Sequence, residues 1–273
     1  MAIVAISRQV AALGDEIASA AAEKLGYRFV RRQNLEKRIV GLGFPAEKLA
    51  KYDEKKPSFF ASLVKDRDEY LQYLQTAVLE EASQNNCILI GRGSPVILEN
   101  VPSLISFRFV AEDAVRLQRL EKEFTWTEKQ ARQRIDESDT NRSGFHKSFF
   151  NVNINDPLLF HLVMNTGIIG VEEGSEIIAA LVRTAVTPEM EREGAEKLRQ
   201  MLDAQHLVNK LVFEDKIAIE FLRAVISGTT VTLQGVADSS AVVENALRLT
   251  AEAMPGYTAK SAVSIIQNFK AYP

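Results

Sequence analysis

The first twenty-six residues constrain the fold more than any other stretch of this chain. The apolar run Ala2 to Ile6 predicts a buried strand, and Ser7 and Arg8 follow it. Residues Asp15 to Leu25 predict a helix, because their apolar positions recur on one side. Gly26 stands where such a helix ends, since glycine adopts the left-handed backbone conformation easily. The chain therefore opens with a strand, a short turn and a helix.

The turn between this strand and helix decides what the arrangement can bind. A strand, turn and helix in this order are typical of a phosphate-binding loop, which needs several glycines, a Lys and a Ser or Thr. Here residues 9–14 keep only Gly14, and the carboxylates Asp15 and Glu16 follow it. Two interpretations stay open. The stretch is a remnant phosphate site in which a carboxylate holds magnesium through water, or an ordinary helix start where acids complement the helix dipole.

Further apolar runs predict a parallel sheet covered by helices on both faces, and hence an α/β fold. They do not alternate with polar residues, and helical patterns separate them. Their ranges are Cys87–Ile90, Leu104–Val110 and Leu158–Met164. Ligands of such sheets bind beyond the carboxyl ends of the strands. We therefore expect Ser7, Arg92 and Asn165, which follow strand ends, to lie along one edge.

Arginine residues supply the candidate phosphate ligands. Arg92 lies between two glycines, and its guanidinium either clamps a monophosphate or pairs with a nearby acid. Residues 111–147 are charged and predicted to be helical. Within them Arg116 and Arg119 are three residues apart and therefore share a helix face. With Arg142 they either stabilise a transferring phosphoryl group or form a solvated basic face.

The sequence pattern changes after residue 184, which predicts two domains, 1–184 and 185–273. Thr187 is a credible helix cap with Pro188 at the first helical position. The later residues predict a small module of helices and an antiparallel sheet, with strands at 217–226, 230–236 and 257–267 and a helix at 239–254.

Composition limits the kinds of binding partner and the cellular compartment that we expect. The net charge of −3 gives no general basic field, so we expect no nucleic-acid partner. The single cysteine, Cys87, rules out a disulfide within the chain and fits a buried strand position in a reducing compartment. The three histidines are far apart, which predicts no metal site. We read no signal peptide and no membrane span, and expect a cytoplasmic protein.

The order of these pieces resembles the cytidylate-kinase-like branch of the P-loop nucleoside monophosphate kinases. The matching stretches are Ile6-Ser7-Arg8, Gly14 with Glu16-Ile17-Ala18, Ile88 to Gly93, Ala111 with Arg116 and Arg119, Asp139 with Arg142, and Asn165-Thr166. In addition, Asp53-Glu54 with Pro57-Ser58-Phe59 looks like the family's monophosphate-side segment. The resemblance covers roughly residues 1–183.

This resemblance implies a kinase fold that uses ATP and Mg²⁺ to phosphorylate an acceptor such as CMP. It implies binding roles for Ser7, Arg8, Gly14, Asp15, Glu16 and Arg92, and catalytic roles for Arg116, Arg119, Asp139 and Arg142. In the family the loop is glycine-rich with a basic residue after it, whereas this chain has Ala11, Leu13 and Asp15. Our leading hypothesis is therefore a degenerate member that binds a nucleotide or phosphate-like anion weakly or not at all, and acts in regulation or interaction. An active kinase and a non-enzymatic partner-binding protein are the alternatives.

Residues 185–273 resemble a BON domain, a small α+β fold of envelope-associated bacterial proteins. The resemblance depends on the hydrophobic pattern and on the stretch Val231 to Gly235. We expect a homo-oligomer or a protein partner to bind through this C-terminal module.

Overall fold

The structure is a computed structural model that describes residues 2–49, 52, 64–84 and 86–266. The chain divides into two compact units, Met1–Lys197 and Leu198–Pro273. The division falls inside helix α9 (Pro188–Asn209), later in the chain than the boundary predicted at residue 185. The stretch that resembles the monophosphate-side segment, 53–59, lies outside the described residues.

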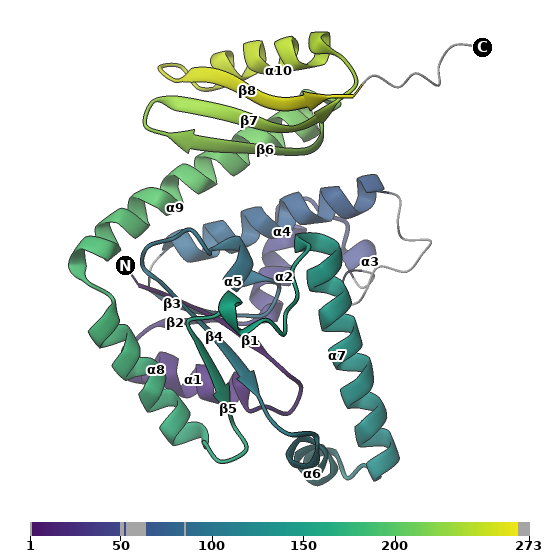
Figure 1. Cartoon of the computed structure of the whole chain (residues 1–273), viewed down its shortest axis with the longest axis vertical. Coiled ribbons are helices and arrows are strands. Elements are labelled where there is room, and N and C mark those ends of the chain that lie inside the picture. The colour runs from purple at the N-terminus through teal and green to yellow at the C-terminus, as the bar shows by residue number, and fades with distance from the viewer. Residues whose placement is uncertain (1, 50–51, 53–63, 85, 267–273) are drawn as a thin grey trace. The chain divides into compact units, whose positions relative to one another are not determined.

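The first unit is built on a parallel sheet of five strands, in the order β2-β3-β1-β4-β5 (Figure 1). The strands are β1 (Ile3–Arg8), β2 (Arg28–Val30), β3 (Cys87–Ile90), β4 (Leu104–Val110) and β5 (Leu162–Asn165). Each neighbouring pair runs parallel. The α/β class with a helix-flanked parallel sheet is confirmed.

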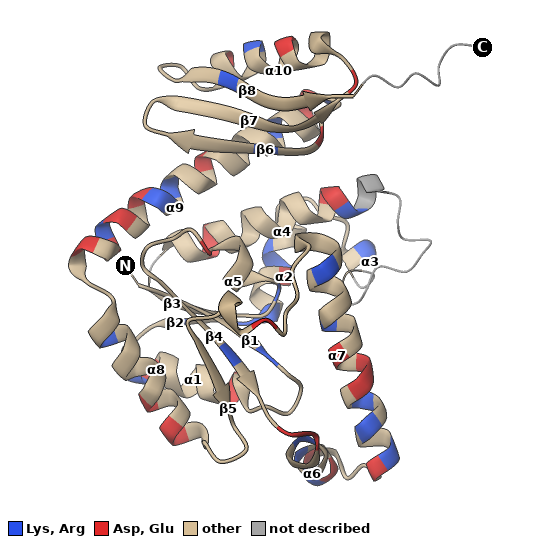
Figure 2. Ribbon diagram, in the orientation of Figure 1, with Lys and Arg blue, Asp and Glu red and all other residues tan. Residues whose placement is uncertain are grey.

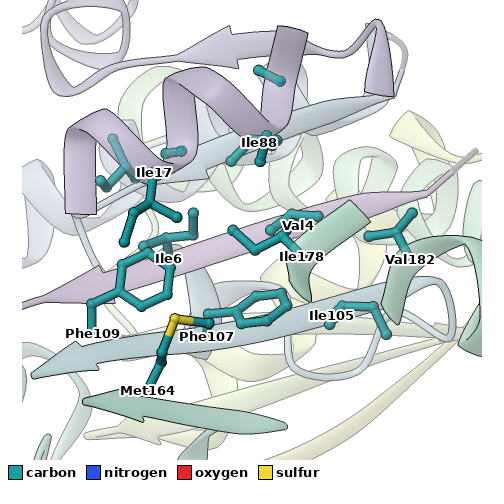
Figure 3. Packing of buried hydrophobic residues seen from close by; sticks show 14 of the residues in the cluster. Val4, Ile6, Ile17, Ile88, Ile105, Phe107, Phe109, Met164, Ile178 and Val182 are labelled. Carbon is teal, nitrogen blue, oxygen red and sulfur yellow. The ribbon is translucent and has the colours of Figure 1, made fainter. Parts of the chain in front are cut away.

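Helices pack on the sheet and supply its apolar cover. Helices α1 (Gly14–Leu25) and α8 (Val171–Ala185) contribute Ile17, Ile178 and Val182 to a core with strand residues such as Ile6 and Phe107 (Figure 3). The remaining helices of this unit are α2 (Arg32–Gly41), α3 (Ala46–Leu49), α4 (Val64–Gln84), α5 (Ser94–Ile97), α6 (Asp113–Phe124) and α7 (Glu128–Phe150). Among the helices that the structure describes, none has the length and apolar character needed to cross a membrane.

The register places the predicted strand ends along one edge. Ile6 of β1 is level with Ile90 of β3, and Val110 of β4 is level with Asn165 of β5. The residues that follow these strands therefore meet at the carboxyl edge of the sheet, as expected. Cys87 is buried in β3, where burial raises the pKa of its thiol to about 12.

Two details of the first unit differ from the sequence prediction. Strand β5 begins at Leu162, because Pro157 starts a short 3₁₀ turn (Pro157–Leu159) that Asp156 caps. Strand β2 was not expected, since only three residues form it and two of them are half-buried.

The second unit has a three-stranded sheet, β6 (Glu220–Ser227), β7 (Thr230–Ala237) and β8 (Thr258–Ile265). It also contains the end of α9, the π-helical turn η3 (Lys210–Glu214) and helix α10 (Ser240–Ala253). The predicted antiparallel sheet is wrong in one respect, because β8 runs parallel to β7. Helix α10 connects these two strands, and a helical crossover brings the chain back in the same direction.

Candidate functional site

The loop between β1 and α1 has the backbone of a glycine-rich turn without its glycines. Ala11 and Leu13 have φ angles of 58° and 54°, in the left-handed region. A side chain makes this conformation unfavourable by about 1–2 kcal/mol, whereas glycine adopts it freely. In the family that the sequence resembles, the loop carries glycine at these two positions. The chain therefore keeps the shape of the loop at a cost in backbone strain.

The N-terminus of α1 combines open backbone donors with a carboxylate. The first N–H groups of a helix have no partner inside the helix, so those of Gly14, Asp15 and Glu16 face outward. Arg8 lies against this turn, since a Cβ on Gly14 would stand 2.7 Å from the Cβ and Cγ atoms of Arg8. The Arg8 Nε atom donates to Asp15 Oδ2 at 3.3 Å, and the Asp15 side chain is 56% exposed. An acid and its own counter-ion thus lie together at the first turn of α1.

Arg92 is held inside the protein by several partners. Its guanidinium is fully buried and donates to the Tyr52 carbonyl at 2.7 Å and to the Tyr70 hydroxyl at 2.9 Å. It also forms an ion pair with Glu36. Burial raises the pKa of Glu36, but hydrogen bonds and charges from Arg32 and Arg92 outweigh it and leave that pKa below its usual value. The pairing with an acid matches one of the two interpretations of Arg92.

Arg116 joins the two helices of the α6–α7 hairpin. Its Nη atoms donate to both carboxylate oxygens of Asp139, at 3.2 and 2.8 Å, and to Asp113 at 2.6 Å. Burial lowers the pKa of Arg116, but these two acids more than reverse that effect and leave it raised. Arg142, in contrast, donates to Ser138 of its own helix at 2.6 Å. Asp139 thus pairs with Arg116, and Ser138 is one of the partners of Arg142.

Arg119 connects the hairpin to the loop. Its Nη1 atom donates to the Ala11 carbonyl at 3.0 Å and to the Thr166 hydroxyl at 3.1 Å, and its Nη2 atom donates to the Thr166 carbonyl at 2.5 Å. Apolar contacts support this connection, because Val10 and Ala11 pack on a cluster of hairpin residues, Leu117, Leu120, Ala131 and Ile135. The hairpin thus lies against the loop that begins α1.

Arg108 is a site residue that the sequence analysis missed. It lies on β4 and is buried. Figure 2 shows Lys and Arg in blue on the strands and helices of this unit. Its Nη1 atom donates to Ser7 Oγ at 3.0 Å, and its Nη2 atom donates to Asn155 Oδ1 at 2.8 Å. Burial lowers the pKa of Arg108 to about 10. A lone cation within a mainly apolar strand was the signal that could have identified it.

The α1 N-terminus lacks the positively charged side chain with which the resembling family binds a triphosphate. No Lys follows the loop, and the Asp15 carboxylate is already paired with Arg8. Across the residues with assigned positions, no group of three or more His, Cys, Asp or Glu could hold a metal ion. The positively charged side chains lie instead on the neighbouring strands and on the hairpin.

One solved structure agrees with this fold. A solved structure of an uncharacterized protein from Eubacterium ventriosum superposes with a TM-score of 0.54 at 16% identity, over 67% of this chain and 99% of that one. A shikimate kinase from Bacteroides thetaiotaomicron gives 0.41 at 13% identity, over 67% and 98% of the chains. A gluconokinase from Sinorhizobium meliloti gives 0.43 at 15% identity, over 67% and 93%. No curated protein matches the sequence.

A protein-family model gives the assignment. The model described as the cytidylate kinase-like family matches residues 3–168, which is more than half of the chain. The matched range contains the loop, the arginines and the hairpin described above. The chain therefore belongs to the cytidylate kinase-like family.

Proposed function

We propose that the first unit binds a phosphate-bearing ligand, such as a nucleotide, and does not transfer phosphate from ATP. The Arg8–Asp15 ion pair on the first turn of α1 carries this proposal. In phosphoryl transfer the β- and γ-phosphates need positive charge and backbone donors close by. A carboxylate in that position opposes the requirement. The protein then acts through binding, in regulation or interaction, and not through turnover.

The expected repulsion between Asp15 and a triphosphate is large compared with the gain from a carboxylate at a helix N-terminus. Two unit negative charges at ~5 Å and an effective dielectric constant of ~20 repel by about 3 kcal/mol. That free energy corresponds to more than a hundredfold in affinity. The gain from a carboxylate at a helix N-terminus is only about 0.3–1 kcal/mol. Before salt, magnesium and the Arg8 guanidinium screen the exposed Asp15 carboxylate, its repulsion of a triphosphate is therefore the larger effect.

An active kinase that phosphorylates CMP is the second candidate, and magnesium is the route to it. The exposed Asp15 carboxylate offers oxygen ligands that Mg²⁺ prefers, and a bound ion would neutralise part of the repulsion. Under this alternative, removing the Asp15 carboxylate weakens ATP binding.

Reversing the charge at residue 15 separates the two candidates. We expect Asp15→Arg to bind Mg²⁺-ATP at least tenfold more tightly than the wild type in calorimetric titration. Glu189→Arg is the matched control, because Glu189 is also an acid in the first turn of a helix, α9. The control should leave the affinity unchanged. Weaker ATP binding by Asp15→Arg would contradict the proposal and favour the active kinase.

We further propose that the C-terminal part is a separate BON-like partner module with its boundary near residue 185. The separate sheet of the second unit and its own buried core, which includes Leu222, Val231 and Leu233, support this proposal. A fragment of residues 185–273 contains all of α9 and should unfold cooperatively on its own. A fragment that stays unstructured would contradict the boundary.

A further inference from the structure

The buried arginines of the first unit differ in how their charge is balanced. Among the described residues Arg92, Arg108 and Arg116 are buried. Arg92 pairs with Glu36, and Arg116 pairs with two aspartates. Within the described part of the chain, Arg108 has no carboxylate oxygen within ion-pair distance. It is thus a buried cation without a direct counter-ion.

The partners of Arg108 are neutral oxygens. Ser7 Oγ and Asn155 Oδ1 accept its two hydrogen bonds, and the Phe160 ring centroid lies 5.8 Å from its Cζ atom. Removing a guanidinium from water is costly unless a negative charge offsets it, and neutral acceptors offset it only in part. Burial accordingly lowers the pKa of Arg108 to about 10. A ligand that brings a negative charge would remove this penalty.

The surroundings of Arg108 favour an anion with more than one charge. Asp139 raises the pKa of Arg108, whereas Arg142 and Arg116 lower it, so charges of both signs act on the guanidinium from the hairpin. Asp139 already forms an ion pair with Arg116. The fork of a guanidinium matches two oxygens of a phosphate group. A phosphate monoester carries close to two negative charges at neutral pH.

Asn155 gives a ligand a way to reach this guanidinium. It is exposed, whereas Arg108 and Ser7 are buried. Its amide oxygen is therefore the acceptor of Arg108 that lies on the solvent side. A ligand oxygen could replace the amide without disturbing the sheet.

We propose that Arg108 and Ser7 bind the phosphate group of a phosphate monoester, which displaces the Asn155 amide. This inference deepens the proposed function and depends on its claim that the first unit binds a phosphate-bearing ligand. It names the arginine on β4 as the ligand of that phosphate. It does not depend on ATP or on the loop before α1.

The test converts the displaceable amide into a fixed counter-ion. Asn155→Asp places a carboxylate beside Arg108 with almost no change in shape. We expect it to weaken binding of inorganic phosphate and of CMP at least tenfold in calorimetric titration, and to raise the thermal unfolding midpoint. Asn153→Asp is the matched control, since it adds the same charge to the same segment. Its side-chain oxygen can still accept the hydrogen bond from the Asn155 N–H, and its affinities should stay within about twofold of the wild type.

Several results would overturn the inference. One is a wild-type protein that binds neither inorganic phosphate nor CMP. Another is equal phosphate affinity for Asn155→Asp and the wild type. A third is a loss of cytidine binding as large as the loss of CMP binding, because cytidine lacks the phosphate. Rapid CMP phosphorylation by the wild type would instead contradict the proposed function, and the affinities of Asn155→Asp would still report on Arg108.

Discussion

The two sides of the candidate site each have one of two features of a phosphate-binding site, which are the backbone shape of the loop and positive charge. The loop before α1 keeps the backbone shape, with Ala11 and Leu13 in left-handed conformations, but Asp15 gives it negative charge. The opposite side keeps positive charge on Arg92 and Arg108, and holds these side chains with protein partners. The loop shape and the positive charge are thus found on different sides of the site. This difference is the basis of our proposal that the first unit binds an anion on the arginine side and not at the loop.

The largest expected effect concerns the arginine side. Arg92→Met should reduce the free energy of unfolding by about 2–5 kcal/mol, because it leaves Glu36 and the Tyr52 carbonyl without their buried donor. Arg32→Met removes the other cation bound to Glu36, but Arg32 is 37% exposed, so its cost should be about 1 kcal/mol or less. Urea unfolding measures both. Equal losses would mean that burial of Arg92 does not distinguish it from a surface ion pair.

A smaller effect is expected where the loop enters α1. Gly14→Ala should reduce stability by about 1–3 kcal/mol, because the new Cβ would meet Arg8 at 2.7 Å and Phe109 at 3.3 Å. Gly41→Ala is the control, since Gly41 also lies in a helix and its Cβ would meet no atom within 4 Å. That variant should change stability by less than about 0.5 kcal/mol. A neutral Gly14→Ala would show that Arg8 does not lie against α1.

The smallest effect concerns the retained loop shape. Ala11→Gly should raise the free energy of unfolding by about 1 kcal/mol, because glycine removes the strain of a positive φ. Ala12→Gly is the adjacent control. Ala12 is buried and is absent from the positive-φ positions of the described chain, so glycine there should lower stability by about 0.5–1 kcal/mol. Destabilisation by both changes would contradict a left-handed Ala11.

Much of the fold was predictable, because continuous apolar runs mark strands that are buried on both faces. The strands at Ile3–Arg8, Cys87–Ile90 and Leu104–Val110 were identified in this way. Strand direction was less accessible. The pattern of residues 257–267 shows a strand but does not show whether it runs parallel or antiparallel to β7.

The site was only partly predictable, because its chemistry depends on pairs that are distant in the sequence. Glu36 and Arg92 are 56 residues apart, and Ser7 and Arg108 are 101 residues apart. Sequence periodicity reports on one element at a time and does not reveal such pairs. Asp15, which stands where the family has a basic residue, could be recognised from the sequence because it lies within a single local motif.

Phosphoryl transfer by the wild-type protein tests the central claim most directly. Purified protein is incubated with ATP, Mg²⁺ and CMP, and formation of ADP and CDP is followed over time. If the loop before α1 does not support transfer of phosphate from ATP, we expect turnover below about 0.01 per second. This is at least a hundredfold under the usual range of enzymes. Turnover of CMP at about one per second or faster would show that Asp15 is compatible with catalysis and would contradict the proposed loss of phosphoryl transfer.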